Sequence, residues 1–293
     1  MEFYLVDVFA EEQYAGNQLA VFLASPELDG DQMQRIAREV NFSETTFIVS
    51  GRQENGGYAV RIFTPDVEVP FAGHPTLGTA FVIHQCLEQG RNTSVLLNYA
   101  QTSITVDVED AVYAMVQDVP QFGQVLDDAA ILERALCLRP DDIRVDMPIQ
   151  LVSTGLPAFI IPLASMEALT RCAVDHAHFL SFINKVYKCN VLVFVQESAK
   201  SIRARVFLDD TGFREDAATG SANGNLAAYL LRYAASGGEL RYCVTQGVEM
   251  GRPSTLYVRA SLRDGVFDIR VGGKVRLVAR GQWLGADRAD QAG

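Results

Sequence analysis

The sequence predicts an α+β protein built from two similar halves. Many short segments alternate apolar and polar residues, as Ile104, Val106 and Val108 do, and this alternation is typical of strands. Fewer segments carry the i, i+3, i+4, i+7 spacing of a helix. A strand followed by a loop and a glycine-led helix also occurs twice, starting at Arg61 and again at Arg205. Each half is therefore expected to contain one such strand–loop–helix unit.

The first half is predicted to contain strands at 2–9, 18–24, 45–50 and 58–64, and helices at 31–40 and from Pro75 to Gly90. Asp29 is expected to cap the first helix together with Gln32, three residues further on. Proline suits the first position of the second helix. Three more strands follow up to residue 117, the last two joined by a turn at 109–110.

A segment rich in proline and aspartate, 120–148, surrounds a short predicted helix at 128–138 and marks the domain boundary. We expect an N-terminal half at 1–120, joined by the C-terminal strand 278–293, and a C-terminal half at 121–277. Strands are predicted at 149–153, 157–161, 190–196, 201–208, 240–244, 255–262, 266–272 and 274–280. An amphipathic helix is marked by Phe179, Leu180, Ile183, Val186 and Tyr187, another helix starts at 219–221, and Asp264–Gly265 is a hairpin turn.

Composition and charge exclude several classes of protein. The chain has 293 residues, a net charge of −11 and five cysteines. The sequence has no Lys/Arg cluster of the kind that indicates nucleic-acid binding. Its apolar runs are all shorter than the roughly 18 to 20 residues of a membrane span. The N-terminus lacks the features of a signal peptide. With no Cys-x-x-Cys pair, a disulfide framework or zinc site is not expected. These features favour a cytoplasmic protein with reduced thiols.

Common cofactor and nucleophile motifs are also missing from the sequence. It contains no Walker-type loop, no dinucleotide fingerprint, no His-Glu-x-x-His and no Gly-x-Ser-x-Gly. With no cluster of histidine, cysteine and carboxylate residues, a bound metal is not expected either.

The two repeated segments can be aligned. EVPFAGHP (68–75) lies over EDAATGSA (215–222), which matches Glu68 with Glu215, Gly73 with Gly220 and His74 with Ser221. A helix N-terminus leaves backbone N–H groups unpaired and carries a positive dipole end, and a leading glycine lets a ligand come close. Two such ends facing one cleft would bind an anion, best a carboxylate. Taken singly, each glycine is more often explained by a tight turn.

Glu44 is the first candidate for chemistry. It lies in NFSETTF (41–47), among apolar and hydroxyl neighbours, at the start of a predicted strand. Partial desolvation there would raise the pKa of its carboxyl toward the range useful for general acid–base catalysis. The residues alone favour the alternatives, which are a solvated surface glutamate or a helix C-terminal cap.

His74 and Asp216 are the other candidates. His74 precedes Pro75 at a predicted helix start, where its imidazole either donates to an anionic substrate or only caps the helix. The other three histidines fall within predicted helices. Asp216 precedes the second glycine-led helix, where it either stabilises the helix start or accepts a hydrogen bond from a substrate amine or hydroxyl.

Four segments together resemble those of the PhzF-like family of phenazine-biosynthesis proteins. They are GNQLAVF (16–22), NFSETTF (41–47), RIFTPDVEVPFAGHPTLGTA (61–80) and EDAATGSANGNLAAYL (215–230). The resemblance implies the diaminopimelate-epimerase-like fold, with two pseudo-symmetric halves, each a curled, mostly antiparallel sheet around a central helix. It places the active site in the cleft between the N-termini of the two central helices.

The resemblance also implies a role for each site residue. The best understood relative isomerises a dihydro-hydroxyanthranilate, moving a proton through a glutamate without metal or organic cofactor. Carried over by motif, that glutamate is Glu44, with His74 and Asp216 orienting the substrate. Backbone N–H groups near Gly73, Gly220 and Ser221 would hold its carboxylate, and Asn17 of the first motif would also contact the substrate. The sequence departs from the family at Gln18 and Ala217, where proline is usual.

The implied function is therefore a metal-free, cofactor-free isomerase acting on a small, carboxylate-bearing, cyclic substrate. A racemase or epimerase of a small amino or hydroxy acid is the first alternative. The second is a binding protein that has kept the cleft but lost turnover. The related racemases use two cysteines, which the matched helix starts of this chain lack. The resemblance further implies a homodimer.

Overall fold

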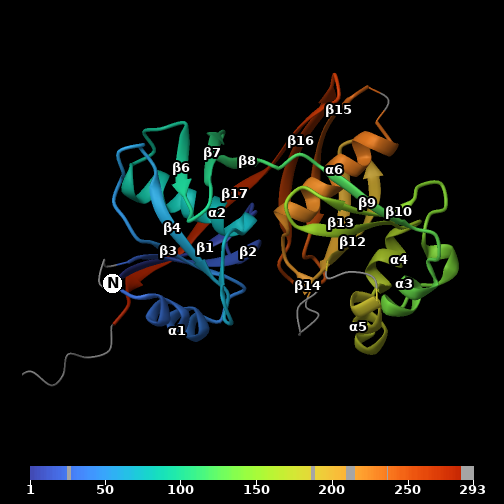
Figure 1. Cartoon of the computed structure of the whole chain (residues 1–293), viewed down its shortest axis with the longest axis horizontal. Helices are drawn as coiled ribbons and strands as arrows, with labels where there is room; N and C mark the ends of the chain where they lie inside the picture. Colours follow the sequence, from blue (N-terminus) through green and yellow to red (C-terminus); the bar gives the residue numbers. More distant parts are fainter. Residues whose placement is uncertain (25–27, 186–188, 209–214, 236, 285–293) are drawn as a thin grey trace, which may run out of the picture. The chain divides into compact units, whose positions relative to one another are not determined.

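The computed structural model describes residues 1–24, 28–185, 189–208, 215–235 and 237–284 (Figure 1). The chain divides into two compact units. Unit 1 comprises residues 1–14, 18–115 and 274–293, and unit 2 comprises residues 15–17 and 116–273. The predicted halves, 1–120 with 278–293 and 121–277, stay a prediction, and residues 285–293 of the returning strand lie outside the described part.

In its described residues, unit 1 is a mixed sheet with two α-helices. Its strands are β1 (Glu2–Val8), β2 (Asn17–Leu23), β3 (Thr45–Ile48), β4 (Tyr58–Phe63), β5 (Glu68–Val69), β6 (Ser94–Asn98), β7 (Ser103–Glu109) and β8 (Val112–Val116). Its helices are α1 (Gly30–Val40) and α2 (Gly73–Phe81), the latter continued by a π-helix at Val82–Leu87. The pairs β2–β3 and β4–β6 are parallel, whereas β3–β4, β6–β7 and β7–β8 are antiparallel.

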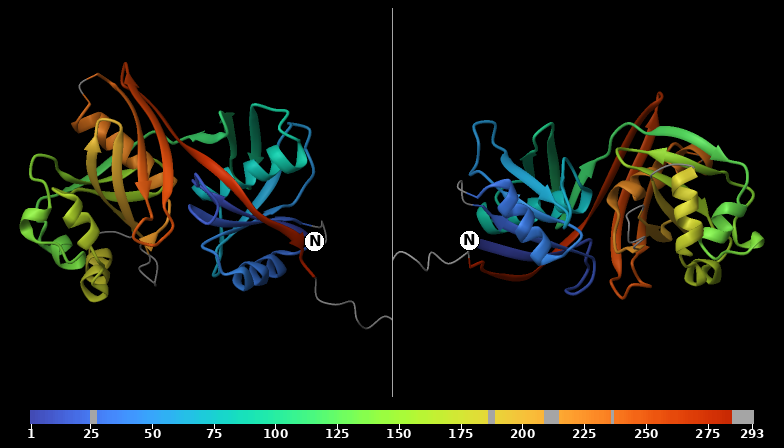
Figure 2. Two further views of the ribbon diagram at one scale, coloured as in Figure 1. Left: turned by 180° about the vertical axis from the view of Figure 1, so that it is seen from behind. Right: turned by 60° about the horizontal axis from the view of Figure 1, so that its bottom comes forward.

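The two helices of unit 1 lie on opposite faces of this sheet (Figures 1 and 2). On one face, Met33 of α1 belongs to a core cluster with Phe22 and Phe47. On the other face, the hydroxyls of Thr46 in β3 and Thr79 in α2 are 2.8 Å apart. Successive strand residues face opposite sides, so the alternation along β3 separates the two packing surfaces.

Unit 2 has the same kinds of elements in a longer stretch of chain. Its strands are β9 (Gln121–Leu126), β10 (Ile149–Ser153), β11 (Pro157–Pro162), β12 (Asn190–Ser198), β13 (Ser201–Phe207), β14 (Glu215–Asp216), β15 (Glu239–Gln246), β16 (Ser254–Arg263) and the first part of β17 (Val266–Gln282). Its helices are α3 (Ala130–Ala135), a 3-10 turn at Pro140–Asp142, α4 (Met166–Arg171), α5 (His176–Lys185) and α6 (Gly220–Tyr233).

The internal repeat predicted from the sequence is present in the strand pairing. β4 pairs antiparallel with β3 and β5 and parallel with β6. β13 pairs antiparallel with β12 and β14 and parallel with β15. The registers agree as well, because Phe63 faces Glu68 as Phe207 faces Glu215. The predicted class, α+β with two similar sheet-and-helix halves, is confirmed.

The shared register also identifies equivalent positions with different residues. Thr45 pairs with Phe63 in unit 1, and Val191 pairs with Phe207 in unit 2, so Thr45 and Val191 correspond. The Thr45 side chain is fully buried, and its Oγ1 finds no hydrogen-bond partner among the described residues. Val191 therefore fills the equivalent position in unit 2 without placing a polar side-chain atom in the core.

Several local predictions hold. Asp29 and Gln32 form the expected capping box of α1, and Asp264 and Gly265 both have the positive φ angles, 51° and 79°, of a two-residue type I′ turn. Other predictions are wrong in detail. The second helix begins at Gly73, ahead of the predicted Pro75, and the short helix α4, capped by Ser165, was not predicted. Val186 and Tyr187 lie outside the described residues.

The strands β9 and β17 differ most from the prediction. The segment 120–148 contains β9, which pairs with β10, although only a short helix was expected there. The strands predicted at 266–272 and 274–280 are one continuous strand, β17, drawn in red in Figure 2. Residues 266–272 of β17 pair with β16, and residues 275–282 pair with β1. Partners on both parts keep the strand extended through Gly272–Gly273.

Candidate active site

Glu44 lies between α1 and β3 in unit 1. The chain leaves α1 through Asn41, which adopts the left-handed conformation (φ 56°). Glu44 is then only two residues before Thr46, which faces α2, so its side chain faces α2 too. Its carboxylate Oε2 is 3.5 Å from Nε2 of His74, with the two side chains 20% and 7% exposed. An acidic group thus lies in a largely enclosed position beside an imidazole.

His74 is held by the first turn of α2. This turn begins at Gly73 after Ala72, which provides no side-chain cap, and it carries no acidic residue. Thr76 Oγ1 donates to the carbonyl oxygen of Ala72 at 2.7 Å and is 2.8 Å from the hydroxyl of Tyr99. The positive end of the helix dipole is therefore not balanced by a carboxylate of its own first turn.

Asp216 ends the short strand β14 in unit 2. Its Oδ1 accepts a hydrogen bond from Nδ2 of Asn17 at 2.8 Å, and its Oδ2 accepts one from the hydroxyl of Thr219 at 2.6 Å. Asn17 Nδ2 is also 3.1 Å from the carbonyl oxygen of Ala218. Both carboxylate oxygens are thus oriented by neighbouring side chains. Asn17, predicted to contact substrate, is here a partner of Asp216.

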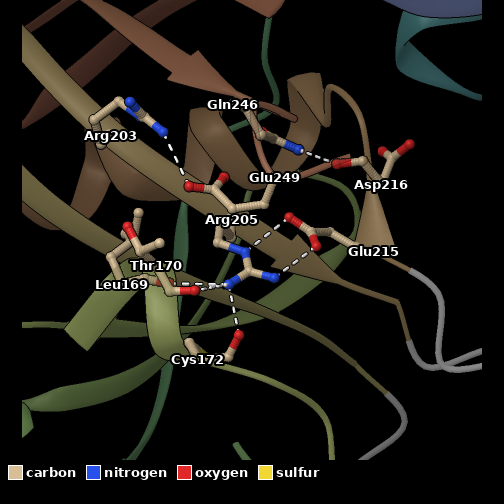
Figure 3. Close-up of polar contacts among 9 residues, drawn as sticks. All are labelled: Leu169, Thr170, Cys172, Arg203, Arg205, Glu215, Asp216, Gln246 and Glu249. Carbon is tan, nitrogen blue, oxygen red and sulfur yellow. Dashed lines mark hydrogen bonds and ion pairs between the residues drawn. The ribbon is translucent and has the colours of Figure 1, made fainter. Parts of the chain in front are cut away.

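Glu215, the neighbour of Asp216, points to the opposite side of β14 and has a structural role. Arg205, whose side chain is 8% exposed, donates to both oxygens of Glu215 at 2.9 and 2.8 Å (Figure 3). The same guanidinium donates to the carbonyl oxygens of Leu169 and Cys172 at the end of α4. Burial is the largest single influence and lowers the pKa of Arg205, but the hydrogen bonds with Glu215 and the attraction of nearby negative charges together raise this pKa above its ordinary value.

Gly220 and Ser221 form the start of α6, and both are buried. Thr219, the residue before the helix, makes no side-chain cap, since its hydroxyl donates to Asp216 instead. The first turn of α6 contains no acidic residue. By contrast, α1 and α4 are capped by Asp29 and Ser165. In both glycine-led helices, therefore, the residue at the N-cap position provides no side-chain cap for the positive dipole end.

The structure assigns the predicted site residues to the two units. Unit 1 contains Glu44, Gly73 and His74, and unit 2 contains Asn17, Asp216, Gly220 and Ser221. That the two groups line one cleft stays a prediction. Sequence reasoning missed Thr219, although it stands inside a quoted motif, and Gln246, whose amide bonds with both Asp216 and Thr219.

The described part of the chain contains no group of three or more His, Cys, Asp or Glu residues arranged to hold a metal ion. Helices long and apolar enough to cross a membrane are likewise absent from the residues described. All five cysteines are free thiols, and burial raises the pKa of Cys172 to about 12.

Comparison with known proteins places the chain in a family. Residues 6–281 match the family described as phenazine biosynthesis-like protein, PhzC–PhzF. A Pseudomonas aeruginosa protein named trans-2,3-dihydro-3-hydroxyanthranilate isomerase is 34% identical over 284 residues, covering 95% of this chain and 97% of its own.

Solved structures agree with this assignment. A Bacillus anthracis phenazine biosynthesis protein of the PhzF family superposes with a TM-score of 0.87 at 25% identity, covering 97% of this chain and 99% of its own. A probable proline racemase of Agrobacterium radiobacter shares the fold, with a TM-score of 0.62 at 13% identity, covering 99% of this chain and 94% of its own. The chain therefore belongs to the phenazine biosynthesis-like (PhzC–PhzF) family and is an isomerase of that family.

Proposed function

We propose that this isomerase moves a proton on a small, cyclic substrate that carries a carboxylate, with Glu44 as the general acid and base. The observation that carries the proposal is the enclosed carboxylate of Glu44, 3.5 Å from His74 Nε2 at the start of α2. A group that both accepts and returns a proton needs a carboxyl shielded from bulk water, because solvation favours the charged form.

The other predicted residues have binding roles in this proposal. Backbone N–H groups near Gly73, Gly220 and Ser221 hold the substrate carboxylate, since two helix starts without side-chain caps favour an anion. His74 orients the substrate next to Glu44. Asp216, held through both oxygens, accepts a hydrogen bond from a substrate amine or hydroxyl. Asn17, which donates a hydrogen bond to Asp216, is proposed to contact the substrate too.

The family supplies the first compound to test. The Pseudomonas aeruginosa relative is named for trans-2,3-dihydro-3-hydroxyanthranilate, a ring that bears a carboxylate, an amine and a hydroxyl. These groups match the anion-binding helix starts and the acceptor at Asp216. No metal or organic cofactor takes part in the proposed reaction, so turnover should survive treatment with EDTA.

The test of Glu44 is a single amide substitution. In Glu44→Gln the side chain keeps its shape but cannot take up a proton at neutral pH. We expect turnover to fall by roughly 100- to 10,000-fold, the usual cost of losing general acid–base catalysis, while calorimetry shows nearly unchanged substrate binding. Glu39→Gln, on the exposed face of α1, is the matched control. Normal turnover by Glu44→Gln would exclude Glu44 as the proton carrier.

Deuterium exchange distinguishes this reaction from its alternatives. An isomerase that moves a proton between carbons places solvent deuterium, or the substrate's own hydrogen, at a new position of the product. A racemase or epimerase of an amino or hydroxy acid would instead exchange the hydrogen at the stereocentre with no change of constitution. A protein that only binds the compound would exchange neither.

We also propose that the protein is a homodimer. The family resemblance implies this state. Light scattering at micromolar concentration should give twice the chain mass, and a mass of one chain would reject the proposal.

A further inference from the structure

We propose that Gln246 is a positioning residue for Asp216, a role that rests on the proposed function of Asp216 in binding substrate. Gln246 is the last residue of β15, and its side chain is fully buried. Tyr242, Val244 and Gln246 alternate as buried residues along the strand, so they share one face. The amide of Gln246 thus reaches the segment between β14 and α6.

The Gln246 amide uses its full hydrogen-bonding capacity on that segment. Nε2 donates to the carbonyl oxygen of Asp216 at 2.8 Å and to Oγ1 of Thr219 at 3.1 Å. Oε1 accepts from Nδ2 of Asn223 at 2.9 Å and from the backbone N–H of Thr219 at 3.4 Å. A primary amide has two N–H donors and two acceptor lone pairs. Because all four have partners, this amide fixes the loop from several directions at once.

The direction of one of these bonds matters most. Nε2 of Gln246 is a donor, so Oγ1 of Thr219 must act as its acceptor. The hydroxyl proton of Thr219 is then directed to Oδ2 of Asp216, 2.6 Å away. Gln246 therefore sets the orientation of a hydroxyl that holds the carboxylate in place, although it does not contact that carboxylate itself.

The hydrogen bonds that run from Gln246 through the Thr219 hydroxyl to the Asp216 carboxylate form a relay. The internal repeat supplies a matched site without this relay. With the parallel pairs β4–β6 and β13–β15 superposed by register, Tyr99 corresponds to Gln246. With the helix starts Gly73 and Gly220 aligned, Thr76 corresponds to Asn223. Thr76 donates to the carbonyl oxygen of Ala72 and hydrogen-bonds with Tyr99, so a strand residue supports each helix start. Among the described residues of unit 1, however, the phenol makes one side-chain bond, with Thr76, and no carboxylate is part of that chain of bonds.

The test is the nearly isosteric substitution Gln246→Glu. When the new carboxyl is ionised, it has only acceptors to offer, so it repels the carbonyl of Asp216 and draws the Thr219 hydroxyl proton away from Oδ2. When protonated, it regains one donor. Burial raises the pKa of a carboxyl, so the effect should change over an accessible pH range. Displacement of a binding group by about 1 Å can cost about 100-fold in rate.

The measurements are kcat/KM and the dissociation constant of trans-2,3-dihydro-3-hydroxyanthranilate, for wild type, Gln246→Glu and Tyr99→Phe. At about pH 8 we expect Gln246→Glu to have a lower kcat/KM and a higher dissociation constant than wild type, each by about 10- to 100-fold. This ratio between variant and wild type should shrink as the pH falls toward about 5. The ratio for Tyr99→Phe should not depend on pH. Thr219→Val, which removes only the relay, should lose about 10-fold at every pH.

The outcomes separate the two proposals. A ratio for Gln246→Glu that stays constant with pH, or stays near one, overturns the positioning role whether or not the wild type turns over. If the wild type binds the compound but does not isomerise it, the proposed reaction fails. A pH-dependent ratio of dissociation constants would in that case still support Gln246. If Gln246→Glu does not fold, loss of affinity in Thr219→Val supports the relay, and unchanged affinity refutes it.

Discussion

Replacing Arg205 by methionine should destabilise the protein strongly, whereas the equivalent change in the first unit should not. Arg205 and Glu215 have side chains only 8% and 14% exposed, and the guanidinium also satisfies carbonyl oxygens at the end of α4 (Figure 3). Methionine fills much of the same volume but leaves the carboxylate of Glu215 buried without its partner. Breaking a buried pair in this way typically costs about 3–5 kcal/mol.

Arg61 is the internal control because the repeat places it at the position of Arg205. It makes the same two-bond pair, with Glu68 at 2.7 and 2.8 Å, and lies over the ring of Phe63 at 5.1 Å, as Arg205 lies over Phe207 at 5.2 Å. However, the side chains of Arg61 and Glu68 are 34% and 43% exposed. An exposed ion pair contributes about 0.2–1 kcal/mol, so Arg61→Met should cost far less.

The assay is urea unfolding of wild type, Arg205→Met, Arg61→Met and the double variant Arg205→Met/Glu215→Met. The double variant should be more stable than Arg205→Met alone, because it removes the unpaired charge together with its partner. Equal losses for Arg205→Met and Arg61→Met would refute the argument that burial sets the cost. A double variant no more stable than Arg205→Met would show that the carbonyl contacts, and not the stranded carboxylate, dominate.

Three further predictions concern single groups. Thr45→Val should leave the free energy of unfolding unchanged or raise it by up to about 1 kcal/mol, because it removes a buried hydroxyl without a described partner; a loss above this amount would contradict it. Hydrogen bonds from Arg171 hold the pKa of Asp142 below its ordinary value of 3.8, so this contribution to stability is present above that value and is lost as the pH falls through the lowered pKa. In acid titrations below about pH 4, Asp142→Asn should therefore lose less stability than wild type. Mass spectrometry after iodoacetamide treatment at neutral pH should find the exposed Cys137 modified and the buried Cys172 unmodified; early labelling of Cys172 would contradict its burial.

The features that could be predicted from the sequence are those set by short-range chemistry. The capping box at Asp29 and Gln32 and the turn at Asp264–Gly265 each depend on a few neighbouring residues, and both are present. The repeat was visible because the order of Arg61 and Glu68, seven residues apart, recurs in Arg205 and Glu215, ten residues apart with one short insertion, and the strand pairs preserve the register around both pairs.

What the sequence did not reveal depends on distant partners. β9 carries no clear alternation and is held by its pairing with β10, which a local pattern cannot express. Asn17 was recognised by its motif, but its partner Asp216 lies 199 residues away. Gln246 stands in no motif at all, and only the fold brings its amide to Asp216 and Thr219. The sequence therefore predicted which residues form the site more readily than it predicted the hydrogen bonds that orient their side chains.

The long strand β17 sets an order for folding during synthesis. The first strand of the chain, β1, pairs with the last residues of β17, from Glu2 with Gln282 to Val8 with Val275, and the amino group of Met1 donates to the carbonyl of Trp283. The strands of unit 2, by contrast, lie between Gln121 and Gly272. On the ribosome, domains generally fold as their residues emerge, the N-terminal one first. Here the N-terminal unit must wait for nearly the whole chain, so its sheet is the last to be completed, and deleting the chain from Val275 onward would impair the unit translated first.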